Sequence, residues 1–255
     1  RARLGDGDAV HRYMAGTIVQ AIAEASRDHG LDAVLMEETN GWAGFVQKRS
    51  PVPVFITLHG PWVLLKSHAT HGSAAADRKR ETRERRGYEA SSGIIAPSQS
   101  VLTAVEGGTP LADKPRIVLP NAFPLETGSA LAADQPSCDI LFVGRFDLLK
   151  GADTVLAAFA QVSENHPQAR LTFAGPGIGL RQADGTMQSA EDALAALPEA
   201  VRARITYMGP VDREEVARLR AKHAVALIAS RFENLNYSLL EAMAAGQAIT
   251  CTAVG

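Results

Sequence analysis

The 255-residue sequence has little of several features that mark particular classes of protein. Its two cysteines are too few for a disulfide scaffold, and no apolar run is long enough to cross a membrane. The net charge of −2 gives no sign of a nucleic-acid partner, and no apolar targeting segment opens the chain. With 46% hydrophobic and 21% charged residues, the composition is typical of a globular protein, for which we expect a cytoplasmic location.

The two cysteines, Cys138 and Cys251, each stand at one end of an apolar run. Their spacing matches no metal-ligand pattern, so we expect two buried free thiols rather than a disulfide. Free thiols fit a reducing compartment.

The remaining sequence alternates short apolar runs with amphipathic segments, most regularly in the second half. Continuous apolar runs between helices indicate parallel strands covered on both faces. We predict an α/β fold of two Rossmann-like domains facing a cleft, comprising residues 1–121 and 122–255. The polar, turn-rich segment 121–137 is interpreted as the linker, and a cleft between two such domains is a usual place for a ligand. The strands of the second half are expected at "CDILFVG", "ARLTFAG", "RITYMG", "AVALIAS" and "AITCTAV", and its helices near 151–165, 191–202, 212–222 and 237–245.

The loop after the first of these strands, "GRFDLLKG", carries two basic residues. Gly144 permits close approach of a ligand to the backbone, and Arg145 and Lys150 could bracket a diphosphate. Basic residues are also common on ordinary surface loops, so this pattern alone leaves both interpretations open.

Two glutamates, Glu233 and Glu241, flank the start of the helix expected near 237–245. Backbone amides near Asn236 and Tyr237 would be free at the helix N-terminus and suited to an anion. A carboxylate can accept two hydrogen bonds from a vicinal diol, so Glu241 suits a ribose and Glu233 a second polyol. The structural alternative is that Glu233 caps the helix and Glu241 is a first-turn residue favoured by the helix dipole.

Two other strand ends carry glycines. "GPGIG" at 175–179 is not a dinucleotide fingerprint, because Leu180 stands where the third glycine is required. A loop flexible enough to pass beside a ligand is left open there. Gly209, followed by Pro210, forms a turn that could lie against a nucleobase or be purely structural.

In the first half, His59 follows the strand "VPVFITL", a position suited to hydrogen bonding with a hydroxyl. His68 and His71 lie further along an irregular loop without matching metal partners, so no metal site is expected. Asp8 in "GDGD" is interpreted as a helix N-cap.

The highly charged segment 77–89 is expected to form a solvated helix held by ion pairs such as Glu81 with Arg85. Peripheral contact with an anionic lipid surface is the sharper alternative.

Taken together, the motifs resemble glycosyltransferase family 4, the retaining nucleotide-sugar transferases of the GT-B fold. The resemblance rests on "LFVGRFDLLKGADTVLAAFA", "ITYMGPVDREEVARL" and the E-x7-E stretch "SRFENLNYSLLEAMAAGQAI", with "FITLHGPW", "GIIAPSQSV" and "VLPNAF" before them. The resemblance implies transfer of a hexose from a donor such as UDP- or GDP-hexose to a sugar, lipid or glycan acceptor, without a cofactor or metal. It also implies that residues 1–121 form the acceptor-side domain.

The resemblance also implies roles for individual residues. Those implied to be catalytic are His59, Glu233, Arg145 and Lys150. Those implied to bind the donor are Gly144, Arg145, Lys150, Gly209, Glu233, Asn236, Tyr237, Ser238 and Glu241.

Some positions depart from the family pattern. Asn234, Leu235 and Asn236 stand where Gly-Phe-Gly is usual, which alters the turn expected to meet the phosphate. The family's opening strand, its glycine-rich loop and its last helices are not in this sequence, so we expect a truncated chain with an incomplete N-terminal domain, which either binds donor poorly or is inactive. A GT-B sugar-nucleotide epimerase and a non-catalytic nucleotide-sugar-binding subunit remain the alternatives.

Overall fold

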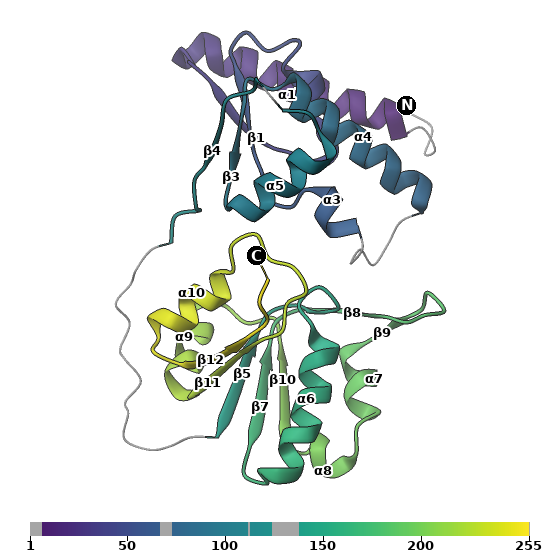
Figure 1. The fold of residues 1–255 in the computed structure, drawn as a ribbon, viewed down its shortest axis with the longest axis vertical. Helices are drawn as coiled ribbons and strands as arrows, with labels where there is room; N and C mark the ends of the chain where they lie inside the picture. The colour runs from purple at the N-terminus through teal and green to yellow at the C-terminus, as the bar shows by residue number, and fades with distance from the viewer. Residues whose placement is uncertain (1–6, 67–72, 112, 124–137, 255) are drawn as a thin grey trace. The chain divides into compact units, whose positions relative to one another are not determined.

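The computed structural model describes residues 7–66, 73–111, 113–123 and 138–254, omitting the side chains of residues 7 and 8. The chain divides into two compact units, one ending at Asn121 and the other spanning Ala122–Val254 (Figure 1). The expected linker lies almost wholly outside the described residues. Each unit is therefore considered by itself.

The first unit is built on a four-stranded, wholly parallel sheet in the order β1-β2-β3-β4. Parallel pairing requires a crossover between successive strands, and helical segments supply these crossovers. The strands are β1 Val34–Glu37, β2 Val54–Thr57, β3 Gly93–Ala96 and β4 Arg116–Val118. The helices are α1 Gly7–His29, η1 Thr39–Gly41, α2 Ala43–Val46, α3 Trp62–Leu65, α4 Ala74–Ala90 and α5 Gln99–Gly108.

The second unit is built on a five-stranded parallel sheet in the order β10-β7-β5-β11-β12. A smaller sheet of β6, β8 and β9 lies beside it (Figure 1). The strands are β5 Asp139–Val143, β6 Phe146–Asp147, β7 Arg170–Ala174, β8 Gly177–Arg181, β9 Met187–Gln188, β10 Ile205–Gly209, β11 Val225–Ile228 and β12 Ala248–Cys251. The helices are α6 Ala152–Asn165, α7 Ala190–Ala195, α8 Glu199–Arg202, α9 Arg213–Lys222 and α10 Tyr237–Ala244.

The core of the second unit contains a cluster of aromatic rings. Phe142 and Phe173 lie on neighbouring strands with their rings 4.3 Å apart, and Phe146 adds a third ring 5.1 Å from Phe173. All three are at most 2% exposed. Buried rings in contact contribute both apolar area and a specific geometry, which holds the first residues of the loop after β5 against the sheet.

The predicted α/β class is confirmed, but several local expectations are wrong. The stretch "GPGIG" is not a free loop, because most of it forms β8, paired with β6 and β9. The helix expected at 191–202 is two short helices, α7 and α8, with Pro198 as the N-cap of the second. A proline cannot donate the hydrogen bond that a continuous helix requires.

The cysteines also differ from expectation. Cys138 and Cys251 are free thiols, as predicted, but both are exposed rather than buried. Cys138 precedes β5 and Cys251 ends β12, the edge strand of the sheet. The apolar runs beside them enter the sheet, whereas the positions at strand ends and on the edge strand remain accessible.

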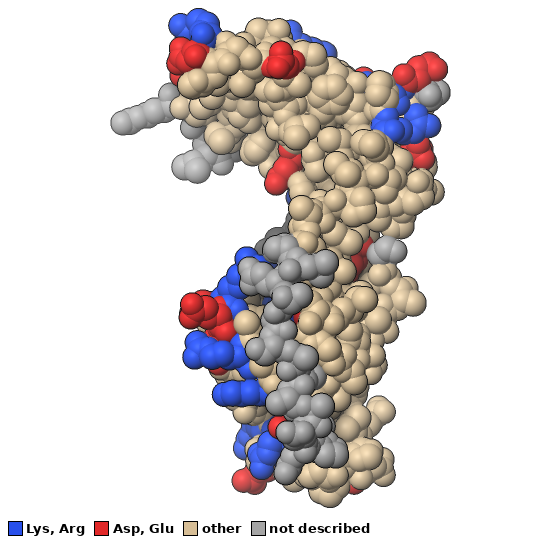
Figure 2. Space-filling model, turned by 90° about the vertical axis from the view of Figure 1, so that its left-hand side faces the viewer, with Lys and Arg blue, Asp and Glu red and all other residues tan. Residues whose placement is uncertain are grey.

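Charge is distributed in mixed groups on the face drawn in Figure 2, where basic and acidic side chains adjoin one another. This mixture agrees with the net charge of −2. Among the described residues, no helix combines the length and apolar character needed to cross a membrane.

Candidate functional site

The loops after β5 and β11 meet at the carboxyl edge of the second unit's sheet. Gly151, the N-cap of α6, has a φ of +74°, and a Cβ there would lie 1.9 Å from the carbonyl oxygen of Ala229. Only glycine permits both this conformation and this close approach. The backbone N–H of Arg231 donates to the carbonyl of Leu149 at 2.8 Å, so the two loops are joined through their main chains.

This junction brings Lys150 and Glu233 into direct contact. Lys150 Nζ lies 2.6 Å from Glu233 Oε1, and the Ser230 hydroxyl donates to the same oxygen at 2.5 Å. Glu233 is 8% exposed, and a carboxylate so buried requires such partners. Two residues that the sequence assigned to one ligand therefore adjoin each other.

Asp147 organises the basic loop and was not singled out from the sequence. Its Oδ1 accepts from the backbone N–H of Lys150 at 2.8 Å, and its Oδ2 lies 2.8 Å from Arg145 Nε. Asp147 is 4% exposed, whereas the Arg145 side chain is 46% exposed. The sequence does contain a signal for Asp147, because it lies between two cations predicted to bind an anion, and an acidic residue in that position can orient both of them.

The start of α10 lies at the same edge. Asn236 is its N-cap, with Oδ1 accepting from Leu239 N at 3.1 Å, so Glu233 is not the cap. The Ser238 hydroxyl donates to the carbonyl of Val143, the last residue of β5, at 3.0 Å. The first amides of α10 thus lie beside the beginning of the basic loop, an arrangement suited to an anion.

Tyr237, the first residue of α10, is 42% exposed. Its ring lies 6.2 Å from that of Phe123. The side chain therefore packs toward the segment that enters the second unit.

Glu241 is the fifth residue of α10, beyond the first turn, and it forms an ion pair with a buried arginine. Arg220 Nη2 lies 2.8 Å from Glu241 Oε2 and donates to the Ser238 hydroxyl at 2.9 Å. Burial lowers the pKa of Arg220, and the hydrogen bond and charge of Glu241 oppose that effect. Arg220 was missed by the sequence analysis.

Three strand ends lie in a row along this edge. The N–H of Gly144 donates to the carbonyl of Ala174 at 2.9 Å, and the N–H of Gly175 donates to the carbonyl of Gly209 at 2.8 Å. Gly175 has a φ of +149°, and a Cβ there would lie 1.9 Å from the carbonyl oxygen of Gly144. Glycines at the ends of β5, β7 and β10 therefore leave the main chain without side chains at the edge where the basic loop begins.

His59 belongs to the first unit, where buried carboxylates hold its loop. Glu38, 1% exposed, accepts from the backbone N–H of His59 at 2.9 Å and from that of Gly60 at 2.6 Å. Glu84, 2% exposed, accepts from the backbone N–H of Trp62 at 2.7 Å. Neither glutamate was singled out as a loop-holding residue from the sequence.

Glu84 also corrects the expectation of a fully solvated helix at 77–89. It accepts from Arg80 Nε at 2.8 Å, and burial raises its pKa against the effect of Arg80. The expected partners Glu81 and Arg85 instead pair with Lys66 and Glu89, respectively. One face of α4 is therefore buried.

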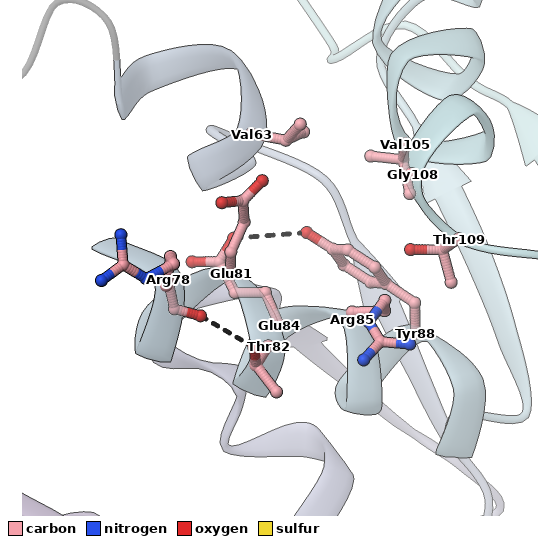
Figure 3. A pocket seen from close by; sticks show the side chains of 10 residues that line it. All are labelled: Val63, Arg78, Glu81, Thr82, Glu84, Arg85, Tyr88, Val105, Gly108 and Thr109. Atoms are coloured by element: carbon pink, nitrogen blue, oxygen red, sulfur yellow. Dashed lines mark hydrogen bonds between the residues drawn. The ribbon is translucent and has the colours of Figure 1, made fainter. Parts of the chain in front are cut away.

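That buried face borders a cavity of about 250 Å³ between α3, α4 and α5 (Figure 3). Val63 and Val105 line it from α3 and α5. Figure 3 shows the Tyr88 hydroxyl directed at Glu84, a contact of 3.4 Å. The Tyr88 pKa is raised by burial and by the neighbouring carboxylates.

All the predicted donor-binding residues lie in the second unit, at strand ends, in loops and in helix α10, whereas His59 lies in the first unit. They are Gly144, Arg145, Lys150, Gly209, Glu233, Asn236, Tyr237, Ser238 and Glu241. Among the described residues, no group of three metal-ligating side chains gathers; His68 and His71 lie outside them.

Two α/β units, each built on a parallel sheet, agree with the GT-B fold of glycosyltransferases, and comparisons with known proteins support this class. The family profile "Glycosyltransferase Family 4" matches residues 9–127, and "Glycosyl transferases group 1" matches residues 137–255. The chain belongs to glycosyltransferase family 4.

Named relatives include D-inositol 3-phosphate glycosyltransferases. That of Mycobacterium ulcerans (strain Agy99) is 35% identical over 120 residues, which are 46% of this chain and 23% of the relative. That of Frankia alni is 31% identical over 138 residues, 52% of this chain and 32% of the relative. The matched part is therefore less than a third of either relative.

Solved structures share the fold. Sucrose-phosphate synthase from Thermosynechococcus elongatus has a TM-score of 0.73 at 23% identity, covering 94% of this chain and 61% of that protein. A UDP-forming α,α-trehalose-phosphate synthase from Burkholderia xenovorans has a TM-score of 0.64 at 14% identity, covering 98% and 65%.

Proposed function

We propose that the chain contributes to a retaining glycosyltransferase that moves a sugar from a nucleoside diphosphate sugar to an acceptor hydroxyl. The observation that carries this proposal is the meeting of Lys150, Glu233 and the N-terminus of α10 at one sheet edge, with Glu241 one turn further along. A diphosphate needs cations and free amides, and the sugars on either side of it need carboxylates.

The role of each group follows from its charge. Arg145 and Lys150 stabilise the negative charge that develops on the leaving diphosphate, the main electrostatic task of such a transfer. Glu233 accepts hydrogen bonds from the donor sugar, and Glu241 accepts them from the ribose. Gly144, Gly209 and the amides of Asn236, Tyr237 and Ser238 allow close backbone approach to the nucleotide and its phosphates.

In the proposed reaction, the bond between the anomeric carbon and the diphosphate oxygen breaks. The acceptor oxygen forms its bond on the same face of the sugar, and its proton passes to a leaving phosphate oxygen. These steps need no redox cofactor or metal. His59 is proposed to contact the donor sugar through its imidazole.

The relatives' names support a donor of this kind. The trehalose-phosphate synthase is described as UDP-forming, and the sequence relatives are glycosyltransferases acting on D-inositol 3-phosphate. An acceptor hydroxyl on a sugar, lipid or glycan is therefore proposed. The epimerase and the non-catalytic subunit are not favoured, since both family profiles describe transferases.

Calorimetric titration of the 255-residue chain with UDP, GDP and ADP tests the proposal. We expect micromolar binding of one of them, weakened about tenfold or more in Glu241→Ala, since a hydrogen bond to a charged group is lost. Glu214→Ala, an exposed glutamate on α9, is the control and should bind as wild type. Binding that survives Glu241→Ala unchanged contradicts the ribose assignment, and no binding of any diphosphate contradicts the donor site in this chain.

A basic groove in the first unit supports peripheral membrane contact as an additional property. A hollow of about 770 Å³ is lined by His11, Arg12, Lys48, Arg49, Arg83, Arg86 and Glu89, among others. Positive charge in one hollow suits anionic headgroups, which attract basic surfaces by roughly 1 kcal/mol per residue.

Co-sedimentation with vesicles tests this contact. The chain should bind phosphatidylglycerol-containing vesicles and not pure phosphatidylcholine, and Lys48→Glu with Arg86→Glu should abolish binding. Equal binding by that variant refutes it. We also propose a cytoplasmic location, where the exposed free thiols of Cys138 and Cys251 remain reduced.

A further inference from the structure

Arg220 is a buried cation whose contacts converge on residues proposed to bind the nucleotide. It lies in the last turn of α9 and is 4% exposed. Its Nη2 donates to Glu241 Oε2 at 2.8 Å and to the Ser238 hydroxyl at 2.9 Å, and its Nη1 donates to Gln247 Oε1 at 3.1 Å. One guanidinium thus joins α9, α10 and the turn before β12.

Burying a guanidinium is costly, and here the cost is only partly offset. Arg220 Nε is buried without a hydrogen-bond partner among the described residues. Replacing both partners of a buried ion pair with well-packed apolar side chains is often neutral or stabilising. An arginine here is therefore better explained by what it does to its neighbours than by stability.

The arginine contacts Glu241 on one side only. The Glu241 side chain is 37% exposed, and its Oε2 is held by Arg220. Among the described contacts, Oε1 accepts no hydrogen bond. The carboxylate is therefore fixed at its protein-facing oxygen and retains an oxygen for an incoming hydroxyl.

Arg220 is itself held firmly. Gln247, 6% exposed, accepts from Arg220 and donates through Nε2 to the carbonyl of His223 at 2.8 Å. The Ser238 hydroxyl, which accepts from Arg220, also donates to the carbonyl of Val143. A side chain locked from several elements can orient another within the tolerance that ligand recognition requires.

We propose that Arg220 is a positioning residue that orients Glu241 toward the ribose diol of the donor, and so sets preference for ribonucleotides over deoxyribonucleotides. This inference rests on the proposed function, since it needs Glu241 to meet the ribose. Fixing the carboxylate before binding removes the entropy loss that a mobile glutamate would incur on meeting the ligand.

A purely structural role for Arg220, joining α9 to α10, predicts a different outcome. Loss of a structural contact would weaken binding of every nucleotide by a similar factor. Loss of Glu241 orientation would weaken the binding of ligands that carry the full diol more than that of their 2′-deoxy forms. The ratio of ribonucleotide to deoxyribonucleotide affinity therefore separates the two roles.

The test measures calorimetric affinities for UDP and 2′-deoxy-UDP, and for the GDP and ADP pairs, in wild type, Arg220→Lys and Glu241→Ala. Lysine retains the charge but lacks the fork that reaches both Ser238 and Glu241. Arg218→Lys on the same helix is the matched control, because Arg218 is an exposed partner of Glu215. Gln247→Met, which removes the acceptor of Nη1, serves as a second variant if Arg220→Lys does not fold.

We expect wild type and Arg218→Lys to prefer the ribonucleotide about tenfold or more, the size of one hydrogen bond to a charged group. In Arg220→Lys the ratio should fall to within about threefold of one, as in Glu241→Ala. Gln247→Met should also lower the ratio of ribonucleotide to deoxyribonucleotide affinity.

Two failures are distinguishable. If wild type discriminates and Arg220→Lys, or Gln247→Met in its place, keeps the full ratio, Arg220 is not a positioning residue and the proposed function stands. If wild type binds no nucleoside diphosphate, or binds the ribose and 2′-deoxyribose forms equally, the donor-site assignment itself fails and the inference fails with it.

Discussion

Lys150 and Glu233, 83 residues apart in sequence, form an ion pair with Nζ and Oε1 separated by 2.6 Å. Because their charges already neutralise each other, the diphosphate binding proposed at Lys150 requires an exchange of partners. Glu233 is then available to hydroxyl donors of a sugar. The pair thus joins the proposed phosphate and sugar positions directly.

Removing the cation from this pair should destabilise the protein. We expect Lys150→Met to lower the free energy of unfolding by about 1–3 kcal/mol, since Glu233 would stay buried without its cation. Urea denaturation of wild type, Lys150→Met, Glu233→Gln and the double variant gives the coupling energy. Lys222→Met, an exposed lysine on α9, is the control. Additive single effects would show that the pair contributes nothing specific.

Lys150→Met should also weaken binding of the phosphates without weakening binding of the nucleoside. We expect affinity for UDP to fall while affinity for uridine stays within about twofold, because only the phosphates meet the cation. Calorimetry with both ligands measures this. Equal losses for both would contradict a phosphate role for Lys150.

The buried Glu38 should matter to the loop that carries His59. Glu38→Gln replaces one acceptor oxygen with an NH2 group facing a backbone N–H, so we expect a loss of about 1–3 kcal/mol in unfolding free energy. Affinity for UDP, governed by the second unit, should not change. Glu37→Gln, at the exposed neighbouring position, is the matched control. Equal stability of the two variants would contradict the holding role of Glu38.

The pH dependence of stability should report the pair of Asp153 and Arg231, joined by two hydrogen bonds of 2.7 Å. Burial raises the pKa of Asp153, but the hydrogen bonds and charge of Arg231 outweigh this, and the net pKa is lowered from 3.8. A depressed carboxyl pKa contributes stability above its unfolded value, and this is lost as pH falls through the folded value.

We therefore expect Asp153→Asn to be less stable than wild type by about 1 kcal/mol or less at neutral pH, since both side chains are a third exposed. The difference should shrink as the pH falls below 3.8 and be lost once the pH has passed through the lowered pKa of Asp153 in the folded protein. Thermal denaturation across this range measures it. A difference that grows in acid would refute the sign of the shift.

The close approach at Gly151 gives a sharper stability test. Gly151→Ala should cost about 2–4 kcal/mol, because it combines a positive φ with a Cβ only 1.9 Å from the carbonyl oxygen of Ala229. Gly107→Ala in α5 meets nothing within 4 Å and should stabilise by about 0.5–1 kcal/mol. Urea denaturation compares them, and equal stabilities would show that the loops can separate without cost.

The sequence predicted the strand–loop–helix order and the motif residues because these depend on local spacing. Lys150 and Glu233 could be assigned to one ligand since both follow parallel strands. Their mutual ion pair was not predicted.

Arg220 and Glu38 could not be assigned in the same way. Arg220 meets Glu241 across 21 residues, and Glu38 meets His59 across the same separation. A lone arginine in a charged helix, or a glutamate beside another glutamate, gives no sign of burial. Their roles come from tertiary contacts, which periodicity does not report.

The exposed thiols of Cys138 and Cys251 have a practical consequence. They are the chain's only cysteines and both lie in the second unit, close to opposite ends of its parallel strands. A maleimide dye on either would report on that unit alone. Replacing one of them with serine and adding one cysteine to the first unit would give a labelled pair, with which fluorescence energy transfer could measure the separation of the units with and without nucleotide.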